Sequence, residues 1–176
     1  MVRHAFRLDG RAAAGGVLLC VALGVGATTI AGRGSAPNQK GVSMTKHASG
    51  TFDVKIGPQK DEGIGDPTIG RMSIDKQYHG DLEGTGLGQM LAGMAAEVKD
   101  SGAYVAIERV RGTLQGRKGS FAVWHRGVMT RGAQDLAVTV IPDSGTDELT
   151  GITGTMTIDI KDGKHFYGLD YTITIP

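Results

Sequence analysis

Apolar and polar side chains alternate most regularly between residues 141 and 175. The pair Asp162-Gly163 interrupts this alternation, and an Asp-Gly pair between two alternating segments is a strong signal for a β-hairpin. A turn at this pair sets Ile160 opposite His165, and it brings the apolar positions of both strands onto one face. A slip of one residue would turn every side chain to the other face, so the agreement specifies the register. The predicted apolar face contains Ile152, Met156, Ile158, Ile160, Tyr167, Leu169, Tyr171 and Ile173.

The segment 103–142 predicts two further hairpins. A turn at Arg117-Lys118 pairs Val110 with His125, and a turn at Arg131-Gly132 pairs His125 with Val138. Both registers place the same residues on one shared face: Tyr104, Ala106, Glu108, Val110, Leu114, Phe121, Val123, His125, Met129, Leu136, Val138 and Val140. The opposite face carries a basic set with one tryptophan, in which Arg111 is expected directly across from Trp124: Arg109, Arg111, Trp124 and Arg126.

The remaining segments of the domain also alternate between apolar and polar residues. Residues 48–56 read as a strand, 57–67 as a Gly/Pro/acid-rich loop, and 68–86 as one long glycine-bent strand or two. Residues 87–100 favour a strand, with a short helix as the alternative because their apolar residues also fit helical spacing. About eight sequential strands joined by short turns form an antiparallel meander, which loses its edges by closing into a barrel. A barrel of this size is filled by side chains or holds one small ligand.

Three segments occurring in order resemble a bacterial domain-of-unknown-function family, numbered 3224. They are "GRMSIDKQYHGDLEGTGLGQML", "GAYVAIERVRGTLQGRKGSF" and "MTRGAQDLAVTVIPDSGTDELTGITGTMTIDIKDGKHFYGLDYTI". The resemblance covers about residues 48–175 and implies an all-β fold of the allene-oxide-cyclase-like type, a closed antiparallel meander barrel of about eight strands. It implies no activity and transfers no site residue, since fold alone does not determine function.

Composition excludes several classes of function. Residues 48–176 contain 13 Lys and Arg against 17 Asp and Glu, a balance of −4, which argues against a nucleic-acid surface. Cys20 is the sole cysteine of the sequence, and the five histidines are isolated from one another, so no metal site and no cofactor are predicted. The glycine-rich "GTGLGQM" lacks the lysine of a phosphate-binding loop. His79, Asp81 and Glu83 share one side of a strand, and we interpret them as a solvent-facing polar edge.

The N-terminal region predicts export to the periplasm or the extracellular space. Residues 1–31 have the basic, apolar and small-residue order of a signal peptide, with cleavage expected after Ala27 or Ala31. A polar linker is expected at 32–47 and the barrel domain at 48–176, with no stable membrane span after processing. The alternative is a cytoplasmic protein whose translation starts at Met44.

Glu108 and His125 are the strongest candidates for a site. Both fall on the apolar face of adjacent strands, with Tyr104 further along, and a carboxylate buried there needs a partner. The leading hypothesis is that the barrel interior binds a small apolar molecule through Tyr104, Glu108 and His125. The alternatives are an isomerase or cyclase acting in the same cavity, and a packed barrel that mediates protein contacts. Assembly into a homo-oligomer is left open.

Overall fold

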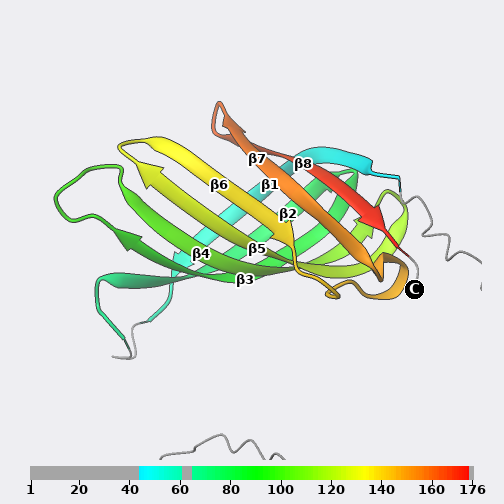
Figure 1. Cartoon of the computed structure of the whole chain (residues 1–176), viewed down its shortest axis with the longest axis horizontal. Coiled ribbons are helices and arrows are strands. Elements are labelled where there is room, and N and C mark those ends of the chain that lie inside the picture. Colours follow the sequence, from blue (N-terminus) through cyan, green and yellow to red (C-terminus); the bar gives the residue numbers. More distant parts are fainter. Residues whose placement is uncertain (1–43, 61–64, 175–176) are drawn as a thin grey trace, which may run out of the picture. The chain divides into compact units, whose positions relative to one another are not determined.

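The computed structural model describes residues 44–60 and 65–174. Eight antiparallel strands follow one another around a closed barrel, each paired with the next and the last paired with the first (Figure 1). The prediction of an all-β, closed antiparallel meander barrel is confirmed. The strands are β1 (Lys46–Pro58), β2 (Ile69–Gly80), β3 (Leu82–Met94), β4 (Gly102–Leu114), β5 (Arg117–Thr130), β6 (Ala133–Val140), β7 (Ile152–Lys161) and β8 (Lys164–Ile173).

Two of the three predicted hairpin registers are confirmed. In β7–β8, Ile160 pairs with His165 and Met156 with Leu169, as the Asp162-Gly163 turn requires. In β5–β6, His125 pairs with Val138 around Arg131-Gly132. Both residues of each turn have positive φ, the backbone geometry that type I′ hairpin turns need and that glycine adopts at no steric cost.

The predicted register of the β4–β5 hairpin is wrong by four residues. The turn lies at Gln115-Gly116, where φ is 45° and 84°, so Leu114 pairs with Arg117 and His125 with Ala106 rather than Val110. The turn follows the same X-Gly pattern as the other two, whereas the expected Arg117-Lys118 pair offers no glycine for the positive φ. A shift by an even number of residues leaves every side chain on its predicted face.

Residues 68–100 form two strands and a loop. β2 and β3 meet at Asp81, and β3 is paired on both sides as far as Gly93, which makes the helical alternative for 87–100 wrong. Residues 95–101 connect β3 to β4 without a strand. β1 begins at Lys46, two residues before the predicted start of the domain.

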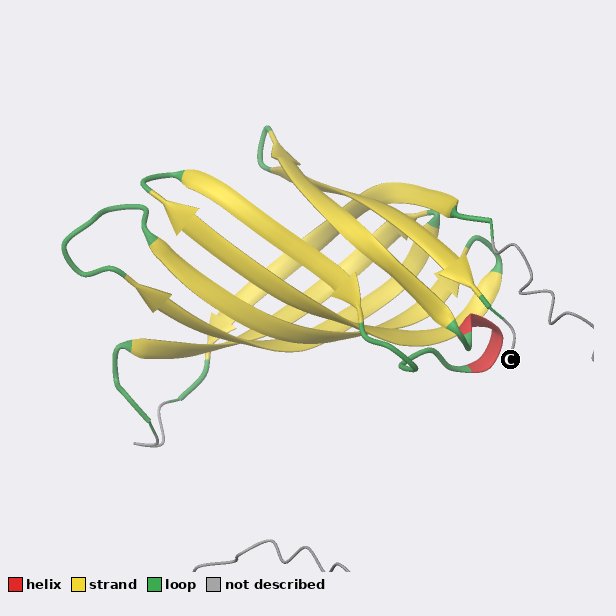
Figure 2. Cartoon of the chain, in the orientation of Figure 1, coloured by secondary structure: helices red, strands yellow, loops and turns green. Residues whose placement is uncertain are grey.

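The two ends of the barrel differ in packing. At one end the interior is filled by buried apolar side chains, including Leu82, Leu114 and Tyr171, and Leu149 of the short 3-10 helix η1 (Asp147–Leu149, red in Figure 2) is packed with them. Inward residues near the opposite end, such as Met94 and Ile160, are exposed. The barrel is therefore packed at one end and hollow at the other.

The predicted signal peptide and most of the predicted linker lie outside the described residues, so export stays a prediction. Within residues 44–60 and 65–174, no helix is long and apolar enough to cross a membrane.

Candidate functional site

A run of alternate glycines on β3 makes room for a polar cluster inside the barrel. Gly86 faces inward between Lys76 of β2 and Val110 of β4, and Gly88 lies opposite Glu108. A methyl group at Gly86 would collide with the carboxylate of Glu108. Since β3 contributes no side chain at these positions, residues of β2 and β4 can meet across it.

Glu108 receives two hydrogen bonds across this space, both from side chains of β2. Its Oε2 accepts from Nζ of Lys76 at 2.8 Å, and its Oε1 accepts from the hydroxyl of Tyr78 at 2.8 Å. Lys76 also donates to the Tyr78 oxygen at 3.3 Å, and its ammonium group lies 4.6 Å from the ring centre of Phe52. Glu108 is fully buried and Lys76 is only 5% exposed, so the pair is an internal salt bridge with its partners in place.

His125 of β5 completes the polar cluster, which we define as Lys76, Tyr78, Glu108 and His125. Its Nε2 lies 3.2 Å from Oε2 of Glu108, within ion-pair distance but without the geometry of a hydrogen bond. The side chain is 3% exposed, and its ring forms part of the cavity wall.

The environment fixes the charge of two groups in the cluster. Burial by itself would raise the pKa of Glu108, but the contacts with His125, Lys76 and Tyr78 outweigh it and hold that pKa at about 2. Burial, followed by the negative charge of Glu108, raises the pKa of Tyr78 well above its usual value of 10. Glu108 is therefore ionised and Tyr78 protonated at neutral pH.

A cavity of about 630 Å³ lies inside the barrel, next to this cluster. All eight strands contribute to its wall, and Lys76 and His125 form its floor. Most of the wall is apolar: Phe52, Val54, Ile56, Met72, Ile74, Met90, Ala92, Met94, Val128, Met129, Leu136, Ile158 and Ile160. Such a combination of apolar wall and a few convergent polar groups is typical of small-molecule sites.

The predicted site residues all face this cavity or its floor. Glu108 and His125 are brought together, whereas Tyr104 lines the wall above Gly127, on which its ring packs. Burial, then the charge of Glu108, raises the pKa of Tyr104, but among the described residues no hydrogen bond joins the two side chains. Tyr104 is thus a wall residue that is separate from the polar cluster.

Sequence reasoning missed Lys76 and Tyr78. Both lie in phase with Ile74 on the inward face of β2. A lysine at an apolar position of an alternating strand is a signal for a buried ion pair, and it could have been read together with Glu108. His79 lies out of phase with these residues and faces solvent, with its Nε2 3.3 Å from Oδ2 of Asp53. Within the described part of the chain, no group of three or more His, Cys, Asp or Glu side chains could hold a metal ion.

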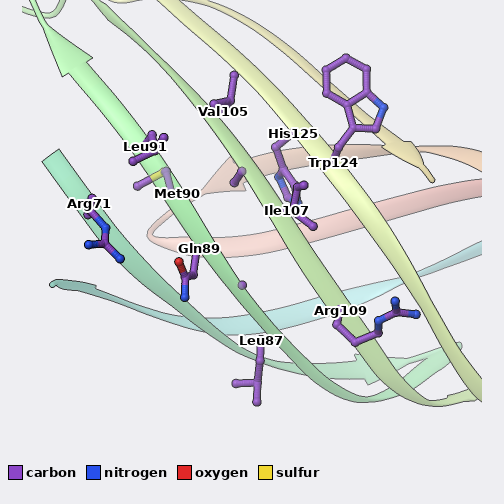
Figure 3. A pocket seen from close by; sticks show the side chains of 12 residues that line it. Arg71, Leu87, Gln89, Met90, Leu91, Val105, Ile107, Arg109, Trp124 and His125 are labelled. Atoms are coloured by element: carbon purple, nitrogen blue, oxygen red, sulfur yellow. The ribbon is translucent and has the colours of Figure 1, made fainter. Parts of the chain in front are cut away.

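A second hollow, of about 880 Å³, lies on the outside of the barrel over β3, β4 and β5 (Figure 3). Exposed apolar side chains form most of it: Leu87, Leu91, Val105, Ile107 and Trp124. Trp124 pairs with Ile107, and Arg111 pairs with Ser120, so the predicted Arg111–Trp124 pair is wrong for the same four-residue reason as above. Apolar surface of this kind is typical of contact with another molecule. His125 also contributes to this hollow, whereas Lys76 lines the interior cavity and not this one.

Comparison with known proteins identifies relatives of unknown function. Residues 48–171 match the family described as "Protein of unknown function (DUF3224)". A crystal structure of a protein with unknown function from this family, from Shewanella oneidensis MR-1, is similar with a TM-score of 0.70 and 44% sequence identity. The similarity covers 76% of this chain and 100% of that chain. Among curated proteins, none matches the sequence.

Proposed function

Because this chain belongs to the DUF3224 family, whose description names no function, we propose from the site alone that it binds a small, mostly apolar molecule inside the barrel. The observation that carries the proposal is the apolar cavity of about 630 Å³ with Lys76 and His125 at its floor. A volume of this size is in the range of pockets that enclose a small organic molecule. A barrel whose interior was filled throughout would leave no such space, so the cavity favours ligand binding over a packed interaction module.

The barrel wall also offers a route to the cavity. β6 and β7 share only two residue pairs, Val138–Met156 and Thr139–Thr155, whereas β7 and β8 are paired along their whole length. Leu136 and Ile158 lie beyond this short ladder and line the cavity. A seam with few ladder hydrogen bonds costs less to separate than the others, so a ligand can reach the interior there or through the hollow end.

Binding of a neutral apolar dye to the full-length chain tests the proposal. N-phenyl-1-naphthylamine is expected to gain fluorescence when it enters the cavity, and Ala92→Trp is expected to weaken its binding by about tenfold or more by filling the space. The control is Leu91→Trp, one residue away on the outward face of β3, which should bind the dye as the wild type does. Equal affinity in both variants, or no dye binding to the wild type, would contradict an interior site.

A second candidate function is proton transfer within a ligand held in the same cavity, as an isomerase or cyclase performs. It is favoured by the distance of 3.2 Å between Nε2 of His125 and Oε2 of Glu108, because a positioned imidazole beside an ionised carboxylate can act as a general base. In this arrangement Glu108 would orient the ring and stabilise its protonated form, and His125 would remove a proton from the ligand and return it at another atom.

His125→Gln separates binding from turnover. This substitution retains hydrogen bonding and removes the imidazole that would act as the base. If the cavity is catalytic, solvent deuterium should be incorporated into a bound ketone by the wild type, and the rate should fall by about 100-fold or more in His125→Gln while dye affinity is kept. If the wild type binds the dye but shows no deuterium exchange, the protein is a binding protein and the enzymatic function is excluded.

A further inference from the structure

The charges around the cavity are balanced at its floor. The ammonium of Lys76 and the carboxylate of Glu108 are 2.8 Å apart and cancel each other, and the Tyr78 hydroxyl is uncharged. Among the described residues that line the cavity, Lys76 is the sole lysine or arginine. A ligand that reaches the floor therefore meets no cation that lacks a counter-charge.

Two acids lie at the rim of the cavity. Asp135 and Asp159 alternate with the inward residues Leu136, Ile158 and Ile160, so their side chains lie on the outer face, and Asp135 forms a salt bridge with Arg126 at 3.0 Å. Asp159 is exposed and has no hydrogen bond or salt bridge among the described residues. A carboxylate that enters the cavity would approach Glu108 in a region of low dielectric constant, where repulsion between like charges is strong. A cationic ligand would in turn meet Lys76.

The floor nevertheless retains hydrogen-bonding capacity. An ammonium group carries three N–H donors, and those of Lys76 serve Glu108 and Tyr78, which leaves one for a ligand. Nε2 of His125 lies 3.2 Å from Oε2 of Glu108 and is not accessible from the cavity, but the ring lies on the cavity wall and its Nδ1 has no hydrogen bond among the described residues. A ligand atom that forms a hydrogen bond with this nitrogen gains affinity.

We propose that the ligand is uncharged and ends in one hydrogen-bonding oxygen, a hydroxyl or carbonyl, that meets Lys76 and His125 at the floor. A carbonyl oxygen accepts from Lys76, and a hydroxyl can also donate to the imidazole. The rest of the molecule is hydrocarbon and contacts the apolar wall. The proposal rests on the proposed binding function. It restricts the ligand to uncharged molecules and excludes fatty acids and other carboxylates.

Five naphthalenes that differ only in their substituent test this ligand class. Competition with N-phenyl-1-naphthylamine on the full-length chain at pH 7 would compare 2-naphthol, 2-acetylnaphthalene, unsubstituted naphthalene, 2-naphthoate and 2-naphthylmethylamine. We expect 2-naphthol and 2-acetylnaphthalene to bind at least about tenfold more tightly than the two charged compounds, and more tightly than naphthalene. If 2-naphthoate equals or exceeds 2-naphthol, the proposal is overturned while the binding function stands. If neither the dye nor any naphthalene binds, the binding function itself fails.

Removing one charge should reverse the preference. Glu108→Gln leaves the Lys76 ammonium without a counter-charge, so the ratio of 2-naphthoate to 2-naphthol affinity should rise by about tenfold or more. Glu97→Gln removes an exposed carboxylate in the loop between β3 and β4 and should leave the ratio unchanged. An unchanged affinity ratio in a folded Glu108→Gln protein would overturn the proposal that the charge balance of Lys76 and Glu108 selects an uncharged ligand. If that variant does not fold, the wild-type ranking decides the proposal.

Discussion

Glu108 shows how a carboxylate is retained in an apolar interior. It is fully buried, and the cost of removing its charge from water is offset by two hydrogen bonds of 2.8 Å and by the nearby imidazole. Removing one partner of such a pair leaves a buried charge without compensation and typically costs about 3–5 kcal/mol. Lys76, Tyr78 and Glu108 therefore act as one unit, and single substitutions in it affect stability as well as any ligand.

Acid is expected to destabilise the protein through Glu108. Its pKa is about 2 in the folded state against 4.5 for an unperturbed glutamate, so the folded state binds fewer protons than the unfolded state in this interval. The stabilisation is fully present above about pH 4.5 and is lost as the pH falls through about 2, with a size of about 3 kcal/mol.

Urea unfolding of wild type and Glu108→Gln between pH 6 and pH 2.5 measures this effect. The free energy of unfolding should fall more steeply in the wild type than in the variant. The double variant Lys76→Met/Glu108→Gln, which removes both charges, serves as a second comparison if the single variant is too unstable. Parallel curves for wild type and variants would show that the pKa of Glu108 is not lowered in the folded state.

β3 contributes to the site because it has no inward side chains at Gly86 and Gly88. Strands in a sheet lie about 4.8 Å apart, so side chains on β2 and β4 are separated by about 10 Å at the backbone. Gly86 and Gly88 leave the inward face of β3 empty, and Lys76 and Glu108 extend into that space until they meet. The glycine-rich "GTGLG", which resembles a phosphate loop only in composition, thus provides room for a salt bridge.

The barrel as a whole combines a packed end with a hollow end. Tyr171, Leu82 and Leu149 fill the packed end, where they supply the apolar burial that stabilises the fold. The hollow end gives up such burial, and its wall residues Ile56, Met94 and Ile160 are exposed by more than half. A ligand that fills this space would recover the burial and stabilise the folded state.

The prediction of export concerns residues 1–31. The order of basic, apolar and small residues in 1–31 predicts cleavage after Ala27 or Ala31. The intact mass of the protein isolated from the periplasm or culture medium of its native host should correspond to a mature chain that begins at Thr28 or Gly32. A protein recovered from the cytosol with an N-terminus at Met44 or Thr45 would instead support translation from Met44.

The alternation of side chains determined the fold class and the face of each strand. Because side chains alternate with a period of two, Glu108 and His125 fall on the same face in any register that differs by an even number of residues. The β4–β5 error of four residues therefore left both of them inside the barrel. The X-Gly turns at 131–132 and 162–163 determined their hairpins because glycine supplies the positive φ that these turns require.

Only the tertiary structure decided which residues meet and how much space remains. The partnership of Lys76 with Glu108 joins strands that are not neighbours, across the empty face of β3, and no pairing rule between adjacent strands reveals it. The cavity likewise depends on how all eight strands close and on which inward side chains reach one another. Local alternation specifies whether each side chain points into or out of the barrel. The distances between side chains and the volume of the cavity are fixed only when the barrel closes.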